Sequence, residues 1–241
     1  MSEASRARQL AEAARAAVDE VFASPHAAFA LDAVGQVGDS LVALVHEDRA
    51  AVGEVRRAAR GPGGDAAHAL GVATIAVGIA HLLGLSTAFR RKLAKGALLH
   101  DLGKSLLPPE LLAKDAPLDD AEWQVVRQHP KLGVDLLTVH GPLDEIVRSA
   151  VMRHHERLDG SGYPYALEGA AVDLPARLVA VADVYDALTS ARPDRGALRA
   201  DEALRLMREA LCGGLDPELL SALAALPLGA CGADPRDPGA A

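Results

Sequence analysis

Aromatic residues are scarce in this chain of 241 residues, where Phe, Trp and Tyr together make up 3% of the sequence. Half of the residues are nevertheless hydrophobic, and most of these are Ala, Leu and Val. Such residues favour packed helices over a β-sandwich, whose strands prefer β-branched and aromatic side chains. The composition therefore predicts an all-α fold with a substantial core, arranged as one domain or as one domain with an N-terminal appendage.

Cysteine and excess positive charge are also lacking. The two cysteines, Cys212 and Cys231, match no zinc-ligand spacing and make no disulfide framework, which favours a reducing cytoplasm. The formal net charge of -8 argues against binding of a nucleic-acid polymer through a broad basic surface. A small anionic nucleotide is still compatible with this charge, because metal ions and a few arginines can reverse the local field.

One long segment, from Ala66 to Phe89, has no charged side chain and could span a bilayer by its length. It also contains His68, His81 and several glycines, so we expect a buried central helix and no membrane contact. The first residues of the chain mix charges and lack the apolar stretch of a signal peptide, which agrees with a cytoplasmic protein.

Apolar residues recur at helical spacing along most of the chain, and no run alternates convincingly as a strand does. Helices are expected at Ser2 to Phe22 and over about 27–60, the second either continuous or broken around Gly35 to Gly38. Gly61-Pro62-Gly63-Gly64 predicts a linker. Beyond it we expect helices at about 66–84, 87–100, 119–128, 130–139, 142–156, 174–190, 200–212 and 216–225. Asp119 and Glu122 are placed to form a capping box.

Two pairs of polar side chains end strongly apolar segments. His100-Asp101 follows residues 96–99, and His154-His155 follows residues 146–152. Imidazole and carboxylate groups are costly to bury unless they are paired or bind metal, and this mixture of ligands suits iron, manganese or zinc. The two pairs together predict a metal site, although a single histidine taken alone is more often a hydrogen-bonded core or surface residue.

These pairs belong to an ordered set of motifs between about Ala66 and Leu223. The set comprises His100-Asp101-x-Gly103-Lys104, Glu122-Trp123, His129-Pro130, His154-His155-Glu156, Asp159-Gly160-x-Gly162-Tyr163-Pro164, Arg177 leading to Ala182-Asp183, Asp186-Ala187-Leu188-Thr189 and Asp216-Pro217-Glu218. In this order the motifs resemble the HD-GYP domain, a branch of the HD phosphohydrolase superfamily whose members hydrolyse the bacterial second messenger cyclic di-GMP. The resemblance implies an HD-type helical bundle as the catalytic domain over residues 61–228. Residues 1–60 are then an N-terminal helical extension of unknown role, and the composition of residues 229–241 predicts a disordered tail.

The resemblance also implies a set of metal ligands, namely His68, His100, Asp101, His129, His154, His155 and Asp183. Asp101 is expected to bridge two ions, and Asp186 to bind a metal or to orient a ligand histidine. We expect two divalent ions, iron or manganese, because Gly64 stands where some family members carry the glutamate of a third site. Two ions about 3.5–4 Å apart would account for phosphodiester hydrolysis.

Further residues are candidates for catalysis and for substrate binding. Lys104 and Asp101 are the expected catalytic residues, with Lys104 holding the scissile phosphate or protonating the leaving oxygen. Tyr163 of the Gly-Tyr-Pro loop and the arginines Arg177, Arg192 and Arg195 are expected to contact the nucleotide. The alternatives are a lysine that only stabilises a helix end, a structural loop and exposed arginines.

The sequence thus predicts hydrolysis of cyclic di-GMP to pGpG and leaves open whether the product is hydrolysed further to GMP. Another cyclic dinucleotide or a nucleotide phosphate is a nearby alternative substrate. A different class of function is a catalytically weak module that binds cyclic di-GMP or a diguanylate cyclase (GGDEF) partner. The complete ligand set and Lys104 favour catalysis. Two departures from the family pattern favour the module: Asp194 in place of the usual Tyr, and the residues that flank His68. A homodimer is compatible with either function.

Overall fold

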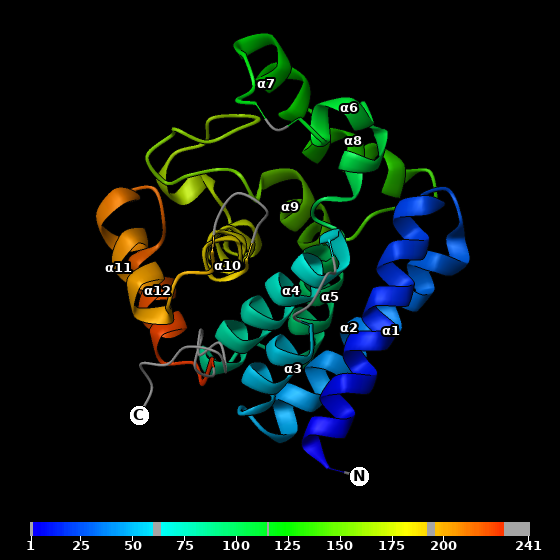
Figure 1. Cartoon of the computed structure of the whole chain (residues 1–241), viewed down its shortest axis with the longest axis vertical. Helices are drawn as coiled ribbons and strands as arrows, with labels where there is room; N and C mark the ends of the chain where they lie inside the picture. The colour runs from blue at the N-terminus through cyan, green and yellow to red at the C-terminus, as the bar shows by residue number, and fades with distance from the viewer. Residues whose placement is uncertain (1, 60–63, 115, 192–195, 229–241) are drawn as a thin grey trace.

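The computed structural model describes residues 2–59, 64–114, 116–191 and 196–228, and it is built from helices (Figure 1). The long helices of the first half are α1 (Glu3–Ala23), α2 (Ala28–Glu47), α3 (Ala51–Ala59), α4 (Gly64–Leu82) and α5 (Thr87–Leu98). They are followed by η1 (Leu102–Leu106), α6 (Pro109–Leu112), α7 (Asp120–Val126), α8 (His129–Thr138), α9 (Glu145–Arg153), η2 (Gly169–Ala171), α10 (Leu174–Thr189), α11 (Ala200–Ala210) and α12 (Pro217–Ala224). No strand occurs among the described residues, so the predicted all-α fold class is confirmed.

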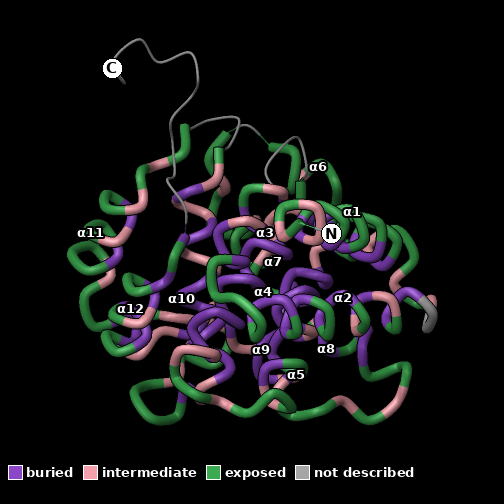
Figure 2. The backbone as a smooth tube through the Cα atoms, turned by 90° about the horizontal axis from the view of Figure 1, so that it is seen from below, coloured by how far each residue is buried: buried purple, intermediate pink, exposed green. Residues whose placement is uncertain are grey.

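Helix α4 is the centre of the fold, and Figure 2 shows it among the buried parts of the chain. It packs against α5 and α10 and also contacts α1 and α3. By length and composition it could cross a membrane, but 72% of its apolar window is buried inside the protein. Its alanines and glycines let neighbouring helices approach closely, and the expectation of a buried central helix is therefore confirmed.

The first three helices pack directly onto this core. Helix α1 contacts α2, α3 and α4, and α2 lies against α5. The considered break around Gly35 to Gly38 is absent, because α2 runs through both glycines and ends at Glu47. Gly38 instead allows close packing: a Cβ atom added there would lie 3.2 Å from Cβ of Ala94 in α5. Most of the predicted linker and the predicted disordered tail, residues 229–241, lie outside the described residues.

Several helix ends meet beside α4 and carry the polar motifs. The chain leaves α5, passes through η1 and packs against the start of α8. This approach needs a glycine, since a Cβ atom on Gly103 would lie 1.9 Å from the carbonyl oxygen of His129. The predicted capping box is also present at the start of α7, with Asp119 and Glu122 each accepting a hydrogen bond from the other's backbone N–H at 2.8 Å. Local sequence therefore fixes where these helices begin and end.

Candidate metal centre

The seven side chains predicted to bind metal come together from distant parts of the sequence. His68 lies on α4, His100 and Asp101 lie between α5 and η1, His129 opens α8, His154 and His155 follow α9, and Asp183 lies on α10. Four of them, His100, Asp101, His129 and His154, are buried, and the other three are partly exposed. The cluster divides into two groups that share one carboxylate.

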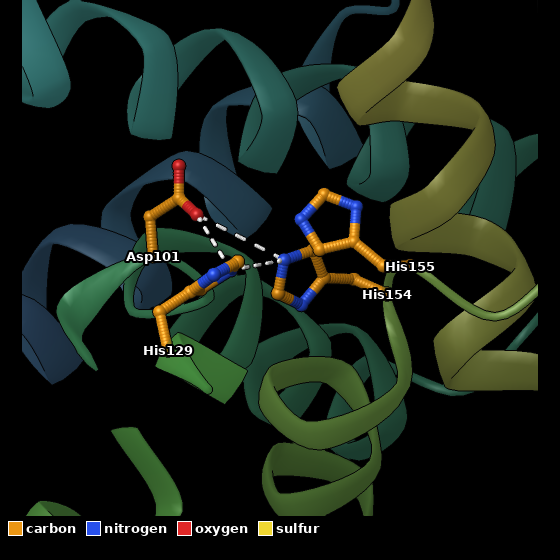
Figure 3. Close-up of side chains that lie close together, drawn as sticks. All are labelled: Asp101, His129, His154 and His155. Carbon is orange, nitrogen blue, oxygen red and sulfur yellow. Dashed lines mark hydrogen bonds and ion pairs between the residues drawn. The ribbon is translucent and has the colours of Figure 1, made fainter. Parts of the chain in front are cut away.

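The first group is the triple-histidine subsite, which consists of Asp101, His129, His154 and His155 (Figure 3). Asp101 Oδ1 lies 3.3 Å from His129 Nε2 and 3.8 Å from His154 Nε2. The two Nε2 atoms of His129 and His154 are 3.3 Å apart. Three imidazoles and one carboxylate oxygen thus point toward a common centre.

The second group is the His68 subsite, which consists of His68, His100 and Asp101. It uses the other oxygen of the shared carboxylate: Asp101 Oδ2 lies 3.3 Å from His100 Nε2 and 4.0 Å from His68 Nε2. Asp183 lies beside both groups, 3.1 Å from His68 Nε2 and 4.0 Å from His155 Nδ1. Asp101 therefore offers one oxygen to each subsite, the arrangement expected of a bridging ligand.

Three of the histidines are oriented by the backbone of their own helix ends. In each, Nδ1 lies within hydrogen-bonding distance of the carbonyl oxygen three residues earlier. The pairs are His100 with Ala97 at 2.7 Å, His129 with Val126 at 2.8 Å and His154 with Val151 at 2.9 Å. A carbonyl oxygen can only accept, so Nδ1 carries the proton and Nε2 presents a lone pair to the cluster.

His68 is oriented differently, by a side chain from another helix. Its Nδ1 lies 2.9 Å from Asp186 Oδ2, so His68 donates to that carboxylate and turns Nε2 toward the cluster. Asp186 occupies space that a glycine leaves open, since a Cβ atom on Gly71 would lie 2.2 Å from Asp186 Oδ1. This geometry supports the expectation that Asp186 orients a ligand histidine.

The groups around Asp101 and Asp183 keep both carboxylates ionised. Burial alone would raise the pKa of Asp101, but the ammonium group of Lys104 holds that pKa well below its usual range. Lys104 Nζ donates to Asp101 Oδ2 at 2.6 Å, and this contact raises the pKa of Lys104 despite its burial. The hydrogen bond from His68 likewise outweighs burial and lowers the pKa of Asp183. Both aspartates are therefore anions at neutral pH, as metal ligands must be.

The histidines fall into two protonation states. Burial lowers the pKa of His155 to about 3 and holds the pKa of His154 well below its usual value, so both rings are neutral. Burial would lower the pKa of His68 too, but hydrogen bonds to Asp183 and Asp186 raise it to about 10. A metal ion in the His68 subsite must therefore displace the proton on His68 Nε2.

Two buried atoms of the cluster have no hydrogen-bond partner in the described part of the chain. They are His100 Nε2 and Asp101 Oδ1. An unsatisfied buried acceptor costs about 1–3 kcal/mol, and two acceptors that face one cluster cannot satisfy each other. Divalent cations would satisfy both. The nitrogen and oxygen donors suit iron, manganese or zinc, so the residues fit the predicted metal ions.

The Gly-Tyr-Pro loop lies beside the triple-histidine subsite. The ring of Tyr163 stacks on His155, with centroids 4.5 Å apart and planes inclined by 26°. Glu156 fixes the loop, as it accepts hydrogen bonds from the backbone N–H groups of Tyr165 and Leu167 at 2.7 and 2.9 Å. Arg127, which the sequence analysis missed, has its Cζ 5.5 Å from the Tyr163 ring centroid. Arg127 lies two residues before the predicted ligand His129, and this proximity is the sequence signal that could have identified it.

Arg177, one of the predicted substrate-binding arginines, is not part of this cluster. Arg177 Nη1 donates to Asp216 Oδ2 at 2.8 Å, so the guanidinium joins α10 to the start of α12. This ion pair gives Arg177 and Asp216, which belong to two different motifs, a structural role. Contact between Arg177 and the nucleotide stays a prediction. Arg192 and Arg195, together with Asp194, lie outside the described residues.

A family model described as "HD domain" matches residues 42–219. A 3′3′-cGAMP-specific phosphodiesterase of Vibrio cholerae is 40% identical over 158 residues, which cover 65% of this chain and 36% of that protein. The cyclic di-GMP phosphodiesterase response regulator RpfG of Xanthomonas campestris is 42% identical over 148 residues, covering 60% of this chain and 39% of the relative. The chain thus spans less than two fifths of the length of these two relatives.

A solved structure has the same fold. It is Bd1817, an HDG"Y"P protein from Bdellovibrio bacteriovorus, with a TM-score of 0.77 and 21% sequence identity. The similarity covers 92% of this chain and 72% of that chain.

Proposed function

The chain belongs to the HD domain family, as its resemblance to the HD-GYP branch predicted, and on this premise we propose that it is a metal-dependent phosphodiesterase. Its proposed reaction is the hydrolysis of cyclic di-GMP to linear pGpG. The observation that carries the proposal is Asp101, which offers Oδ1 to the triple-histidine subsite and Oδ2 to the His68 subsite. Relatives named as cyclic di-GMP phosphodiesterases support the choice of substrate.

The proposed cofactors are two divalent ions, iron or manganese, one in each subsite. When bound, such a pair supplies an activated water at neutral pH and balances charge on the phosphate. The two ions would be held by the seven predicted ligands, namely His68, His100, Asp101, His129, His154, His155 and Asp183. Gly64 supports two ions rather than three, since it offers no carboxylate.

The remaining residues bind and orient the substrate. Lys104 keeps its proton, because its contact with Asp101 raises its pKa, so it can hold the scissile phosphate or donate a proton to the leaving oxygen. Tyr163 offers a ring on which a base can stack, and Arg127 beside it offers a planar cation for a phosphate or a guanine edge. All three side chains lie near the triple-histidine subsite or the shared Asp101.

A second candidate substrate is 3′3′-cGAMP. It is favoured by two relatives from Vibrio cholerae that are named 3′3′-cGAMP-specific phosphodiesterases, each 40% identical to this chain. Both cyclic dinucleotides present the same phosphodiester to the cluster and differ only in one base. The contacts that choose between the bases would therefore come from the loop around Tyr163 rather than from the metal ligands.

The alternative class of function is a signalling module that binds cyclic di-GMP, or a diguanylate cyclase (GGDEF) partner, with little turnover. It rests on Asp194 and on the flanks of His68, which depart from the family pattern. For either function we propose a cytoplasmic protein that acts without a nucleic-acid polymer or a membrane and that can form a homodimer. The buried position of α4 and the free thiol of Cys212 support this location.

Product chromatography separates these functions. The protein loaded with Fe²⁺ or Mn²⁺ is incubated with cyclic di-GMP and, in parallel, with 3′3′-cGAMP, and Asp101→Ala serves as the inactive control. We expect pGpG from cyclic di-GMP, and linear products from 3′3′-cGAMP only if the second substrate applies. Tight cyclic di-GMP binding without product above the control would reject the enzyme and favour the signalling module.

A further inference from the structure

Arg56 of α3 is a buried cation with few partners. Its relative exposure is 4%, and its Nη2 donates to Thr189 Oγ1 at 2.8 Å. The same atom lies 3.7 Å from Asp186 Oδ1, and Cζ lies 5.1 Å from the ring centroid of Tyr185. These three contacts all belong to α10.

The position of Arg56 is costly for the fold. Its Nε and Nη1 atoms are buried and have no hydrogen-bond partner in the part of the chain that the structure describes. A buried charge with an incomplete set of hydrogen bonds gains little stability, and apolar side chains of similar volume often replace such groups without loss. The contacts that Arg56 does make therefore point to a role in positioning.

Those contacts lead to the metal centre through one carboxylate. Asp186 turns Oδ1 toward Arg56 and Oδ2 toward His68 Nδ1, at 3.7 Å and 2.9 Å. Ser190 Oγ donates weakly to Oδ2 at 3.3 Å. Arg56 is the cation that faces Oδ1, so it holds the carboxylate in the orientation in which Asp186 can accept from His68.

This dependence distinguishes His68 from three other histidines of the cluster. His100, His129 and His154 are held by backbone carbonyls of their own helix ends, which side-chain changes elsewhere leave in place. His68 relies on a carboxylate from α10, and that carboxylate faces a cation from α3. An altered position of α3 would therefore reach the His68 subsite and leave the triple-histidine subsite unchanged.

We propose that Arg56 is a positioning residue for the His68 subsite and that, through it, the N-terminal helices are coupled to the metal centre. Helix α3 packs against both α1 and α4, so a partner or domain that shifts α1 could move Arg56. This assigns a role to residues 1–60. The inference rests on the proposed function only in requiring that both subsites bind metal, and it can be tested without measuring turnover.

The test is a titration of the metal-free full chain with Mn²⁺, in which EPR measures the free ion. Wild type is expected to bind two ions. Arg56→Met should weaken binding to one site about tenfold, the lower end of the effect of losing an outer-sphere partner, and should leave the other site unchanged. Arg57→Met is the matched control, because Arg57 is the next residue of α3 and pairs at the surface with Glu54. It should leave both affinities at the wild-type level.

The proposal would be overturned if Arg56→Met kept wild-type affinity at both sites or lost affinity equally at both. It would also be overturned if Arg57→Met showed the same loss as Arg56→Met. If Arg56→Met does not fold, a double-mutant cycle with Arg56→Lys and Asp186→Asn decides. The proposal predicts that Arg56→Lys weakens one site in the wild-type background and causes no further loss in Asp186→Asn. Equal losses in both backgrounds, or none in either, would overturn it. A wild type that binds Mn²⁺ but hydrolyses no cyclic dinucleotide would count against the proposed function alone.

Discussion

The two subsites of the metal centre differ in how their ligands are held. In the triple-histidine subsite, His129 and His154 are oriented by backbone carbonyls three residues earlier, and both side chains are almost fully buried. In the His68 subsite, His100 is also held by a backbone carbonyl, but His68 depends on Asp186 from another helix, and its side chain is 20% exposed. The first geometry is a property of local helix ends, whereas the second depends on the packing of α3, α4 and α10.

One metal centre can therefore combine ligands of fixed orientation with a ligand whose orientation can change. Backbone-held ligands keep their orientation as long as the helix end exists. A ligand held by a chain of side chains can respond to a change elsewhere in the molecule. We therefore expect the ion in the His68 subsite to bind more weakly and to exchange faster than its neighbour.

The largest effect on metal binding and turnover is expected from a change of Asp101, the ligand that both subsites share. Asp101→Ala removes an oxygen from each subsite, so we expect loss of both ions and a fall in turnover of more than about 1,000-fold, because the metal contribution to catalysis is several kcal/mol. Elemental analysis of the purified variant measures the ions, and circular dichroism should show helix content close to that of wild type. Two ions per chain in Asp101→Ala would show that this carboxylate bridges nothing.

A smaller effect on turnover is expected from a change of Lys104, which contacts the shared ligand Asp101 but does not bind metal. Lys104 donates to Asp101, but an ammonium group cannot be a ligand. Lys104→Ala should lower turnover by about 10–1,000-fold, as loss of one transition-state contact does, while both ions stay bound. Steady-state kinetics and metal analysis on the same preparation check this. Unchanged turnover would reduce Lys104 to a structural partner of Asp101.

The smallest effect should fall on one subsite only. In Gly71→Ala the new Cβ would lie 2.2 Å from Asp186 Oδ1, so Asp186 must move and the His68 subsite should lose about tenfold in Mn²⁺ affinity. Gly35→Ala is the control, since its new Cβ would meet no atom of a neighbouring element within 4 Å. The control should gain about 0.5–1 kcal/mol in stability, measured by denaturant unfolding, and keep both affinities. Equal metal affinities in the two variants would contradict the role given to Asp186.

Much of the fold could be predicted from the sequence, because local signals determine helix ends. The helix expected at about 174–190 is α10, and Asp119 and Glu122 form the expected capping box. The helix expected over about 27–60 was wrong in both of its forms. It is not broken near Gly38, because a glycine inside a helix can serve close packing as well as termination, and it is not continuous, because α2 ends at Glu47 and α3 begins at Ala51. The ligand cluster followed from the resemblance, since spacing alone does not bring α4, α8 and α10 together.

The residues behind the ligands could not be predicted in the same way. Arg56 and Arg57 are adjacent in the sequence, and only the packing of α3 against α1 and α4 makes one buried, with its side chain in contact with α10, and the other exposed. Arg177 belongs to a motif, yet its guanidinium is engaged by Asp216 of a later motif. Such pairings depend on tertiary contacts between distant elements, and neither hydrophobic periodicity nor motif order predicts those contacts.

The most direct test of the two-subsite centre is anomalous diffraction at the iron or manganese edge from crystals of the metal-loaded protein. The account predicts two peaks, one at His129 and His154 and one at His68 and His100, with Asp101 in contact with both. Depletion of metal should empty the peak beside His68 first. A single peak, or two peaks that Asp101 does not bridge, would contradict the two-subsite centre. So would a third fully occupied peak, with Asp65 as a ligand in place of the acid that is missing at Gly64.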